Sequence, residues 1–230
     1  MPNDVVNSYG DRRLLAGDGH HGIDIASQRA DALDELAIVQ IGHLKASGIL
    51  PMAADLGCGA GGQVARMAAA GASVIGVDVS DQSASIRRID GDCDFLLTDL
   101  RTIANDKPRL PKAPWHVVVS QRTIHYFRHS EAAALMRALF ERYTMSGSRL
   151  YISASGLLSE LAEGYPDREL PISERFSLLD GGMQAKHGIC QPVCLYTPDE
   201  LASLLAGAGF QPVDVSRSAF GNSKVIAIRD

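Results

Sequence analysis

The chain has 230 residues, 46% of them hydrophobic and 21% charged, which predicts one well-packed globular domain over residues 1–230. Its formal net charge of −5 and its lack of a dense Lys/Arg run argue against nucleic acid as a partner. A polar start and the lack of a long apolar run predict a soluble, cytoplasmic protein without a membrane segment. Four cysteines in a chain of this length do not make a disulfide scaffold, so we expect free thiols.

Strands and helices alternate along most of the chain. Apolar residues at helical spacing predict helices over 25–47, 62–70, 82–89, 130–143 and 197–208. Short β-branched runs predict strands over 52–56, 73–78, 94–99, 115–120, 148–155, 210–216 and 223–229. The last helix has the clearest start, because Thr197, Pro198 and Glu200 form a capping box with proline at the first helical position.

This order of elements predicts an α/β fold, in which a seven-stranded and mostly parallel sheet carries helices on both faces. The last two predicted strands are joined by only about six residues, too few for a crossover helix. We therefore expect the final strand to run antiparallel to the one before it.

A glycine-rich loop follows the first predicted strand and opens a helix, in the stretch AADLGCGAGGQV at residues 53–64. Asp55 precedes three alternating glycines, Gly57, Gly59 and Gly61. Glycines let a ligand lie against the backbone, and free N–H groups at a helix start attract negative charge. A dinucleotide-binding loop is one interpretation, but that motif spaces its glycines unevenly, as G-x-G-x-x-G.

The stretch DLGCGAGGQV resembles the first motif of class I S-adenosylmethionine-dependent methyltransferases, which reads acid-x-Gly-x-Gly-x-Gly. GVDVS, LLTDL and HVVVSQRTIHYF resemble, in order, the motifs at the ends of that family's second, third and fourth strands. With LYTPDELASLLAGAGFQPVDVS, the likeness spans about residues 50–230. The resemblance implies a Rossmann-like methyltransferase sheet, with S-adenosyl-L-methionine as cofactor and S-adenosyl-L-homocysteine as product. A nucleotide-dependent dehydrogenase is the alternative.

The same resemblance assigns cofactor-binding roles. It places Asp55 and the loop glycines along the methionine part of the cofactor, and Asp78 at both ribose hydroxyls, where a carboxylate is a suitable acceptor. Asp99 and the Leu100 amide would meet the adenine, and the end of the fourth strand would face the sulfonium. Singly, Asp78 could cap a helix and Asp99 could occupy a turn. The implied cofactor-binding set is Tyr9, Asp55, Gly57, Cys58, Gly59, Gly61, Asp78, Val79, Asp99, Leu100, Ser120 and Gln121.

Catalysis in this family needs little from the protein beyond alignment of a nucleophile and exclusion of water, and it requires no metal. His125, just past the fourth predicted strand, is the candidate general base, because an imidazole titrates in the useful pH range. Tyr126 is its proposed catalytic neighbour, and Arg122 is placed to orient a substrate. The alternative is that His125 begins the next helix and only packs there.

Two segments lie outside the alternating core. Residues 1–50 hold a polar, Gly- and His-rich flap followed by a helix, and a disordered tail is the alternative for the flap. Residues 156–195 are too long for an ordinary connection. By resemblance to small-molecule methyltransferases they form a substrate lid, and a solvated helical hairpin is the alternative. Predicted lid contacts to substrate are Tyr165, Arg168, Arg175, Phe176, Lys186 and His187.

A metal site is not predicted. His187, Cys190 and Cys194 are near one another in sequence, but structural zinc needs four ligands and no second pair follows. A thiol-rich pocket for arsenite would need Cys58 and Cys93 to converge with them. The default interpretation of each thiol is a small buried apolar side chain.

These observations together predict methyl transfer to a small molecule by a monomer or homodimer. An RNA- or protein-modifying methyltransferase and a non-catalytic cofactor-binding module remain alternatives. The sequence leaves open whether the acceptor atom is oxygen, nitrogen, carbon or sulfur.

Overall fold

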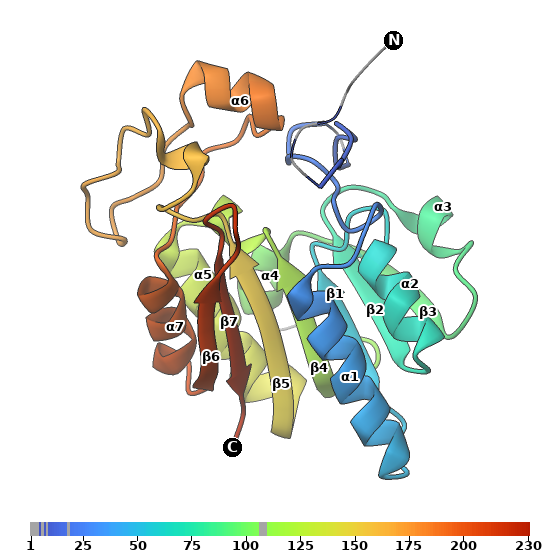
Figure 1. Cartoon of the computed structure of the whole chain (residues 1–230). Coiled ribbons are helices and arrows are strands. Elements are labelled where there is room, and N and C mark those ends of the chain that lie inside the picture. Colours follow the sequence, from blue (N-terminus) through green and yellow to red (C-terminus); the bar gives the residue numbers. More distant parts are fainter. Residues whose placement is uncertain (1–4, 6, 8, 18, 106–109) are drawn as a thin grey trace.

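Seven strands form one sheet in the order β3-β2-β1-β4-β5-β7-β6 (Figure 1). The computed structural model describes residues 5, 7, 9–17, 19–105 and 110–230. The strands are β1 (Met52–Leu56), β2 (Ser73–Asp78), β3 (Cys93–Leu97), β4 (Trp115–Gln121), β5 (Thr144–Ala154), β6 (Gln211–Arg217) and β7 (Ser223–Ile228). The first five run parallel, and β7 is antiparallel to both β5 and β6. The predicted fold class, including the antiparallel last strand, is confirmed.

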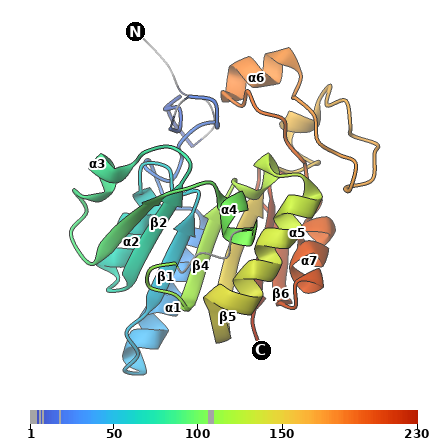
Figure 2. The same ribbon diagram turned by 180° about the vertical axis from the view of Figure 1, so that it is seen from behind.

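Helices cover both faces of this sheet. The α-helices of the chain are α1 (Ala32–Ala46), α2 (Gly62–Ala69), α3 (Ser83–Ile86), α4 (Leu100–Asn105), α5 (His129–Ala138), α6 (Gly181–His187) and α7 (Pro198–Gly207). The first three lie on one face, while α4, α5 and α7 lie on the other (Figures 1 and 2). β1 and β4 are buried almost throughout, because each sits between two helical layers. Among the described residues no helix is long and apolar enough to cross a membrane.

Several predicted boundaries move for identifiable reasons. The predicted helix over 25–47 begins only at Ala32, because Asp31 accepts the Leu33 amide and Asp34 accepts the Asp31 amide in a capping box. The predicted helix over 130–143 leaves α-helical geometry at Leu139, where one π-helical turn leads directly into β5. The six-residue α4 was not predicted from the sequence.

The segment 156–195 is a packed structure with its own apolar core. Its buried members are Leu161, Ala162, Tyr165, Leu179, Ile189, Val193 and Leu195. It stands above the carboxyl ends of the parallel strands, with α6 at its top (Figure 1). This burial of apolar side chains is what an independently packed layer needs, whereas a solvated hairpin would leave them exposed.

The N-terminal segment meets this insertion above the same sheet edge (Figure 1). His21 pairs with Ile189 in an antiparallel bridge. The Gly22 amide donates to the Gly188 carbonyl at 3.0 Å, and the Cys190 amide donates to the His20 carbonyl at 3.1 Å. Two segments more than 160 residues apart in sequence therefore join into one roof over the carboxyl edge.

Residues just before α1 also pack against Gly62, the first residue of α2. A Cβ added at Gly62 would lie 2.1 Å from the Ala26 carbonyl oxygen and 2.7 Å from the Ser27 nitrogen. These are backbone atoms, so they cannot rotate away as the end of a side chain can. The N-terminal segment can rest on α2 only because position 62 has no side chain.

This contact predicts the effect of Gly62→Ala. The added methyl group should push residues 26–27 off α2 and lower the free energy of unfolding by about 1–3 kcal/mol, the usual cost of overpacking. Gly42→Ala is the matched control, since Gly42 is exposed in α1 with nothing within 4 Å of the added Cβ. That control should gain about 0.5–1 kcal/mol from helix propensity. Urea unfolding measures both, and a Gly62→Ala protein as stable as the parent would contradict the contact.

Candidate functional site

A cavity of about 1350 Å³ opens at the carboxyl edge of the sheet, beneath the roof. Its walls come from the glycine loop, the ends of β2 and β4, the N-terminal segment, the insertion 156–195 and the β6–β7 turn. Ligands of open parallel sheets bind at this edge, at the point where the strand order reverses, which here lies between β1 and β4.

The glycine loop is held in a form that only glycine allows at its first position. Gly57 has φ +80°, and a Cβ there would lie 2.1 Å from the Thr123 hydroxyl oxygen. The turn after β4 therefore packs directly on the loop after β1. This contact brings the two strand ends together as one wall of the cavity.

Asp78 joins the loop to the end of β2. One carboxylate oxygen accepts the Gly59 amide at 2.9 Å, and the other accepts the Ser80 amide at 2.9 Å. Each oxygen can accept a further hydrogen bond, so the carboxylate offers two acceptors to a ligand in the cavity. Val79 follows in the lining and is exposed there.

Two buried acids, Asp55 and Asp34, belong to the part of the site near the glycine loop. Burial raises the pKa of Asp55 well above its usual range, and the neighbouring carboxylates of Asp34 and Asp78 raise it further. Asp34 comes from the first turn of α1, is 2% exposed, and accepts the Gln121 side chain at 2.5 Å. Burial raises its pKa too. Such a group of acids in low dielectric suits a cationic ligand.

Asp99 lies farther along the edge, at the start of α4. Burial alone would raise its pKa, but the hydrogen bonds and charge of Arg101 outweigh burial and lower it. The Arg101 guanidinium binds the Asp99 carboxylate at 2.6 Å. Leu100 is buried beside it and also lines the cavity.

The two residues that end β4 differ in position. The Ser120 hydroxyl is 1% exposed, donates to the Leu56 carbonyl at 2.9 Å and does not line the cavity. Gln121 does line it, but its amide is bound to Asp34. Gly61 likewise lies outside the lining, whereas Gly57, Cys58 and Gly59 belong to it.

Residues 53–147 match the family model of a methyltransferase domain. Among similar solved structures is the CcbJ methyltransferase of Streptomyces caelestis, at 15% identity and a TM-score of 0.62, with 93% of this chain and 98% of that chain covered. Another is the 1,6-didemethyltoxoflavin-N1-methyltransferase of Burkholderia thailandensis, solved with S-adenosylhomocysteine, at 18% identity and a TM-score of 0.59, covering 86% and 79%.

A third is magnesium protoporphyrin IX methyltransferase of Synechocystis with bound S-adenosylhomocysteine, at 18% identity and a TM-score of 0.56, covering 86% of this chain and 83% of that chain. Residues 53–147 therefore resemble a methyltransferase domain, and the chain shares the fold of these solved structures. No curated protein matches it in sequence. At these identities the solved structures establish the fold, and the family match adds the domain type.

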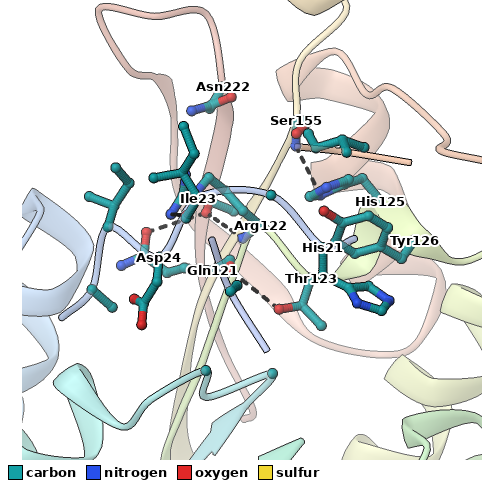
Figure 3. A pocket seen from close by; sticks show the side chains of 18 of the residues that line it. His21, Ile23, Asp24, Gln121, Arg122, Thr123, His125, Tyr126, Ser155 and Asn222 are labelled. Atoms are coloured by element: carbon teal, nitrogen blue, oxygen red, sulfur yellow. Dashed lines mark hydrogen bonds between the residues drawn. The ribbon is translucent and has the colours of Figure 1, made fainter. Parts of the chain in front are cut away.

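Arg122 follows β4 in an unusual backbone conformation. Its φ is +51°, a left-handed value that costs a side-chain-bearing residue about 1–2 kcal/mol. A hydrogen bond fixes this strained conformation, because the Arg122 amide donates to the Ser153 carbonyl at 2.9 Å. Figure 3 shows the half-buried Arg122 side chain between the segment at Ile23 and Asp24 and the ring cluster of His21, His125 and Tyr126. The guanidinium donates to the Ile23 carbonyl at 3.2 Å.

His125 lines the cavity but is 1% exposed. Burial, with the nearby Arg122 charge, lowers its pKa to about 3. Its Nδ1 accepts the Ser155 amide at 3.4 Å, so the neutral ring carries its hydrogen on Nε2, which is buried without a hydrogen-bond partner among the described residues. This environment favours a neutral donor rather than the predicted base. Tyr126 packs on His125, with ring centroids 4.2 Å apart.

The predicted substrate residues of the insertion divide into two groups. Phe176, Lys186 and His187 line the cavity. Arg168 and Arg175 do not. Both Lys186 and His187 lie against Glu160, at 2.5 and 2.9 Å.

Arg175 is instead a buried structural residue. Its guanidinium binds Glu200 at 2.9 Å, and Glu200 is the carboxylate of the capping box that starts α7. The same side chain donates to the Leu195 and Leu170 carbonyls. Sequence reasoning placed it at the substrate because it could not show that the α7 cap would need a cation. Tyr165 is likewise internal, since its hydroxyl donates to the Val193 carbonyl at 2.5 Å.

Tyr9 lies at the rim of the cavity and is 60% exposed. Its ring meets Phe220 of the β6–β7 turn edge-on at 5.3 Å, and the Arg29 guanidinium covers it at 4.7 Å. The described part of the flap is thus held against the β6–β7 turn.

The four cysteines are free thiols. Cys58 and Cys194 are buried, Cys93 is half-buried and Cys190 is exposed on the insertion. Within the described ranges, no three His, Cys, Asp or Glu side chains come close enough together to hold a metal ion.

Several cavity residues were missed by sequence reasoning. Asp24 accepts the Ser27 amide at 3.0 Å and the Ala60 amide at 3.4 Å, and so reaches the glycine loop from the flap. Lys224 of β7 lines the cavity and binds Asp31 at 2.6 Å. Only for Asp34 was a signal present, since an acid three residues after Asp31 at a helix start is a capping pattern.

The raised pKa of Asp55 predicts how stability depends on pH. Above about pH 4 the unfolded chain releases this proton while the folded chain keeps it, so the free energy of unfolding should fall as pH rises toward the folded pKa. Asp55→Asn removes this contribution and should give a flatter pH dependence and higher stability at neutral pH. Urea unfolding from pH 4 to 8 tests this, with exposed Asp90→Asn as control. Equal slopes for Asp55→Asn and the parent would refute it.

His125 should stay neutral throughout the physiological range. With a pKa of about 3, its ring proton resonance should move by less than about a tenth of a full titration between pH 8 and 5. The resonance is identified by its loss in His125→Gln. A midpoint near pH 6.5 in the NMR titration would instead support His125 as a general base.

Proposed function

We propose that this protein transfers the methyl group of S-adenosyl-L-methionine to a small-molecule nucleophile. The observation that carries the proposal is the Asp78 carboxylate bound to the Gly59 amide, which sets two acceptors and a bare loop along one wall of a deep cavity. Two of the similar methyltransferases were solved with S-adenosylhomocysteine, which supports the same ligand for this fold.

The residues present fit this cofactor. Asp78 would hold the ribose hydroxyls, and Asp99 with Leu100 would meet the adenine at the outer end of the cavity. The methionine ammonium would lie near Asp55 and Asp34, where a cation relieves the repulsion among buried carboxylates. Lining positions that complete the proposed set are Tyr9, Gly57, Cys58, Gly59, Val79 and Gln121.

When bound, S-adenosylmethionine supplies an electrophilic methyl group on a positively charged sulfur. The protein's part is to align a nucleophile and exclude water, and the roof of flap and insertion is suited to both. We infer that the insertion 156–195 acts as a lid within a single domain. His125 would act by packing and by its Nε2 hydrogen, with Tyr126 against it, rather than by removing a proton.

A small-molecule acceptor fits this arrangement better than a macromolecule. The cavity is covered from above by the pairing of His21 with Ile189, and this cover would block a folded RNA or protein from the sheet edge. The cytoplasmic location and the choice between monomer and dimer stay predictions from the sequence.

Binding of S-adenosylhomocysteine tests the assignment of Asp78. Asp78→Ala should weaken binding at least about tenfold, because two ribose hydroxyls lose a charged acceptor worth about 1.5–3 kcal/mol. Asp81→Ala is the control, since that exposed acid lies outside the cavity lining. Titration calorimetry measures both, with urea unfolding to confirm that each variant is folded.

Unchanged affinity in Asp78→Ala would remove Asp78 from the site. Absence of binding to the parent protein would refute the proposed function itself. Tight binding without turnover of any acceptor in a broad metabolite screen would instead favour a non-catalytic cofactor-binding module.

A further inference from the structure

The cavity is electrically divided. Carboxylates gather at the glycine-loop end, where Asp24, Asp55 and Asp78 approach the loop. The Arg122 guanidinium lies beyond them, beside the ring cluster of His21, His125 and Tyr126 (Figure 3). A ligand that reaches from the glycine loop past Asp24 therefore meets carboxylates first and the Arg122 guanidinium next.

Arg122 differs in its pairing from four other cations that line this cavity. Arg29 binds Asp11, Arg101 binds Asp99, Lys186 binds Glu160 and Lys224 binds Asp31, all within 2.9 Å. No ion pair joins Arg122 to a carboxylate in the part of the chain that the structure describes, and its guanidinium contact there is the Ile23 carbonyl.

The two nearest acids are already engaged elsewhere. Asp31 caps α1 and binds Lys224, and Asp24 accepts the Ser27 and Ala60 amides. Both still attract Arg122 electrostatically, but burial outweighs them and lowers the pKa of its guanidinium. A partly buried charge without a carboxylate partner is costly, and a ligand anion would supply that partner.

The backbone of Arg122 is strained at the point where its side chain joins the cavity lining. The left-handed φ of +51° is fixed by bonds from the Arg122 amide to both the carbonyl and the hydroxyl of Ser153. A residue held in a strained conformation at a cavity is a recurrent sign of a functional position. Because the pKa of His125 is lowered to about 3, its ring is neutral and adds no second positive charge beside the Arg122 guanidinium.

We propose that Arg122 binds a carboxylate group of the methyl acceptor, so that the substrate class is an organic acid. The geometry of a guanidinium matches a carboxylate through two parallel hydrogen bonds, which a neutral amide cannot reproduce. This inference rests on the proposed function, because it assigns the cofactor to the acidic end. The cofactor's own carboxylate is the competing partner for the same guanidinium.

The test compares acids with their amides on the protein saturated with S-adenosylhomocysteine. The pairs are 4-hydroxybenzoate with 4-hydroxybenzamide, salicylate with salicylamide, and nicotinate with nicotinamide, titrated by thermal shift. In the parent protein at least one acid should bind about tenfold or more tightly than its amide, as charge-assisted bonds predict. If no acid is preferred while S-adenosylhomocysteine binds, this inference fails and the proposed function stands.

Variants at position 122 test whether Arg122 causes the preference for an acid over its amide. Arg122→Asn should abolish it while the protein stays folded, because asparagine tolerates left-handed backbone. Arg122→Lys should retain part of it, and Arg137→Asn, which removes an exposed charge from α5, should retain all of it. A preference that survives in Arg122→Asn would overturn the assignment.

Calorimetry separates the competing partner. Arg122→Asn should change the affinity for S-adenosylhomocysteine less than about threefold. A loss of tenfold or more would mean that Arg122 holds the carboxylate of the cofactor, and would overturn the inference. Failure of S-adenosylhomocysteine to bind the parent protein would refute this inference together with the proposed function.

Discussion

The site depends on the close approach of two loops at Gly57. A side chain there would overlap Thr123, so the turn after β4 can reach the loop after β1 only because position 57 is bare. That approach sets the glycine loop against Gln121 and Arg122 in one wall, with Asp78 tied to the loop through the Gly59 amide. Strain at Arg122 and crowding at Gly57 thus belong to one feature, in which local preference is given up to shape a cavity.

Electrostatics then divides that cavity into two ends with different chemistry. Burial raises the pKa of Asp55 and the neighbouring Asp34 carboxylate raises it further, an arrangement that destabilises the folded chain at neutral pH and that a cationic ligand would relieve. Arg122 is the counterpart, a cation whose nearby acids are engaged by Lys224 and by backbone amides. Both ends are better satisfied with a ligand of opposite charge than without one.

The fold and the glycine loop were largely predictable, because their signals are local in sequence. Alternating strands and helices predicted the sheet, and the loop was read from consecutive residues, whereas the role of Asp78 was implied only by the family resemblance. The partners of Arg175 and Asp34 were not predictable, since Glu200 and Gln121 meet them only after distant elements pack. The role of His125 stays a prediction for the same reason: its residue type suggested a base, but burial and the Ser155 amide influence its protonation.

The roof over the cavity is built from two segments that are each anchored elsewhere in the fold. The flap and the insertion are joined by the bonds from Gly22 to Gly188, from Cys190 to His20 and from Arg13 to Ala185. Such bonds contribute about 0.5–1.5 kcal/mol each, so separating the two segments costs only a few kcal/mol in this region of the molecule. Each segment keeps its own support, since Asp24 anchors the flap at the glycine loop and Arg175 anchors the insertion at α7.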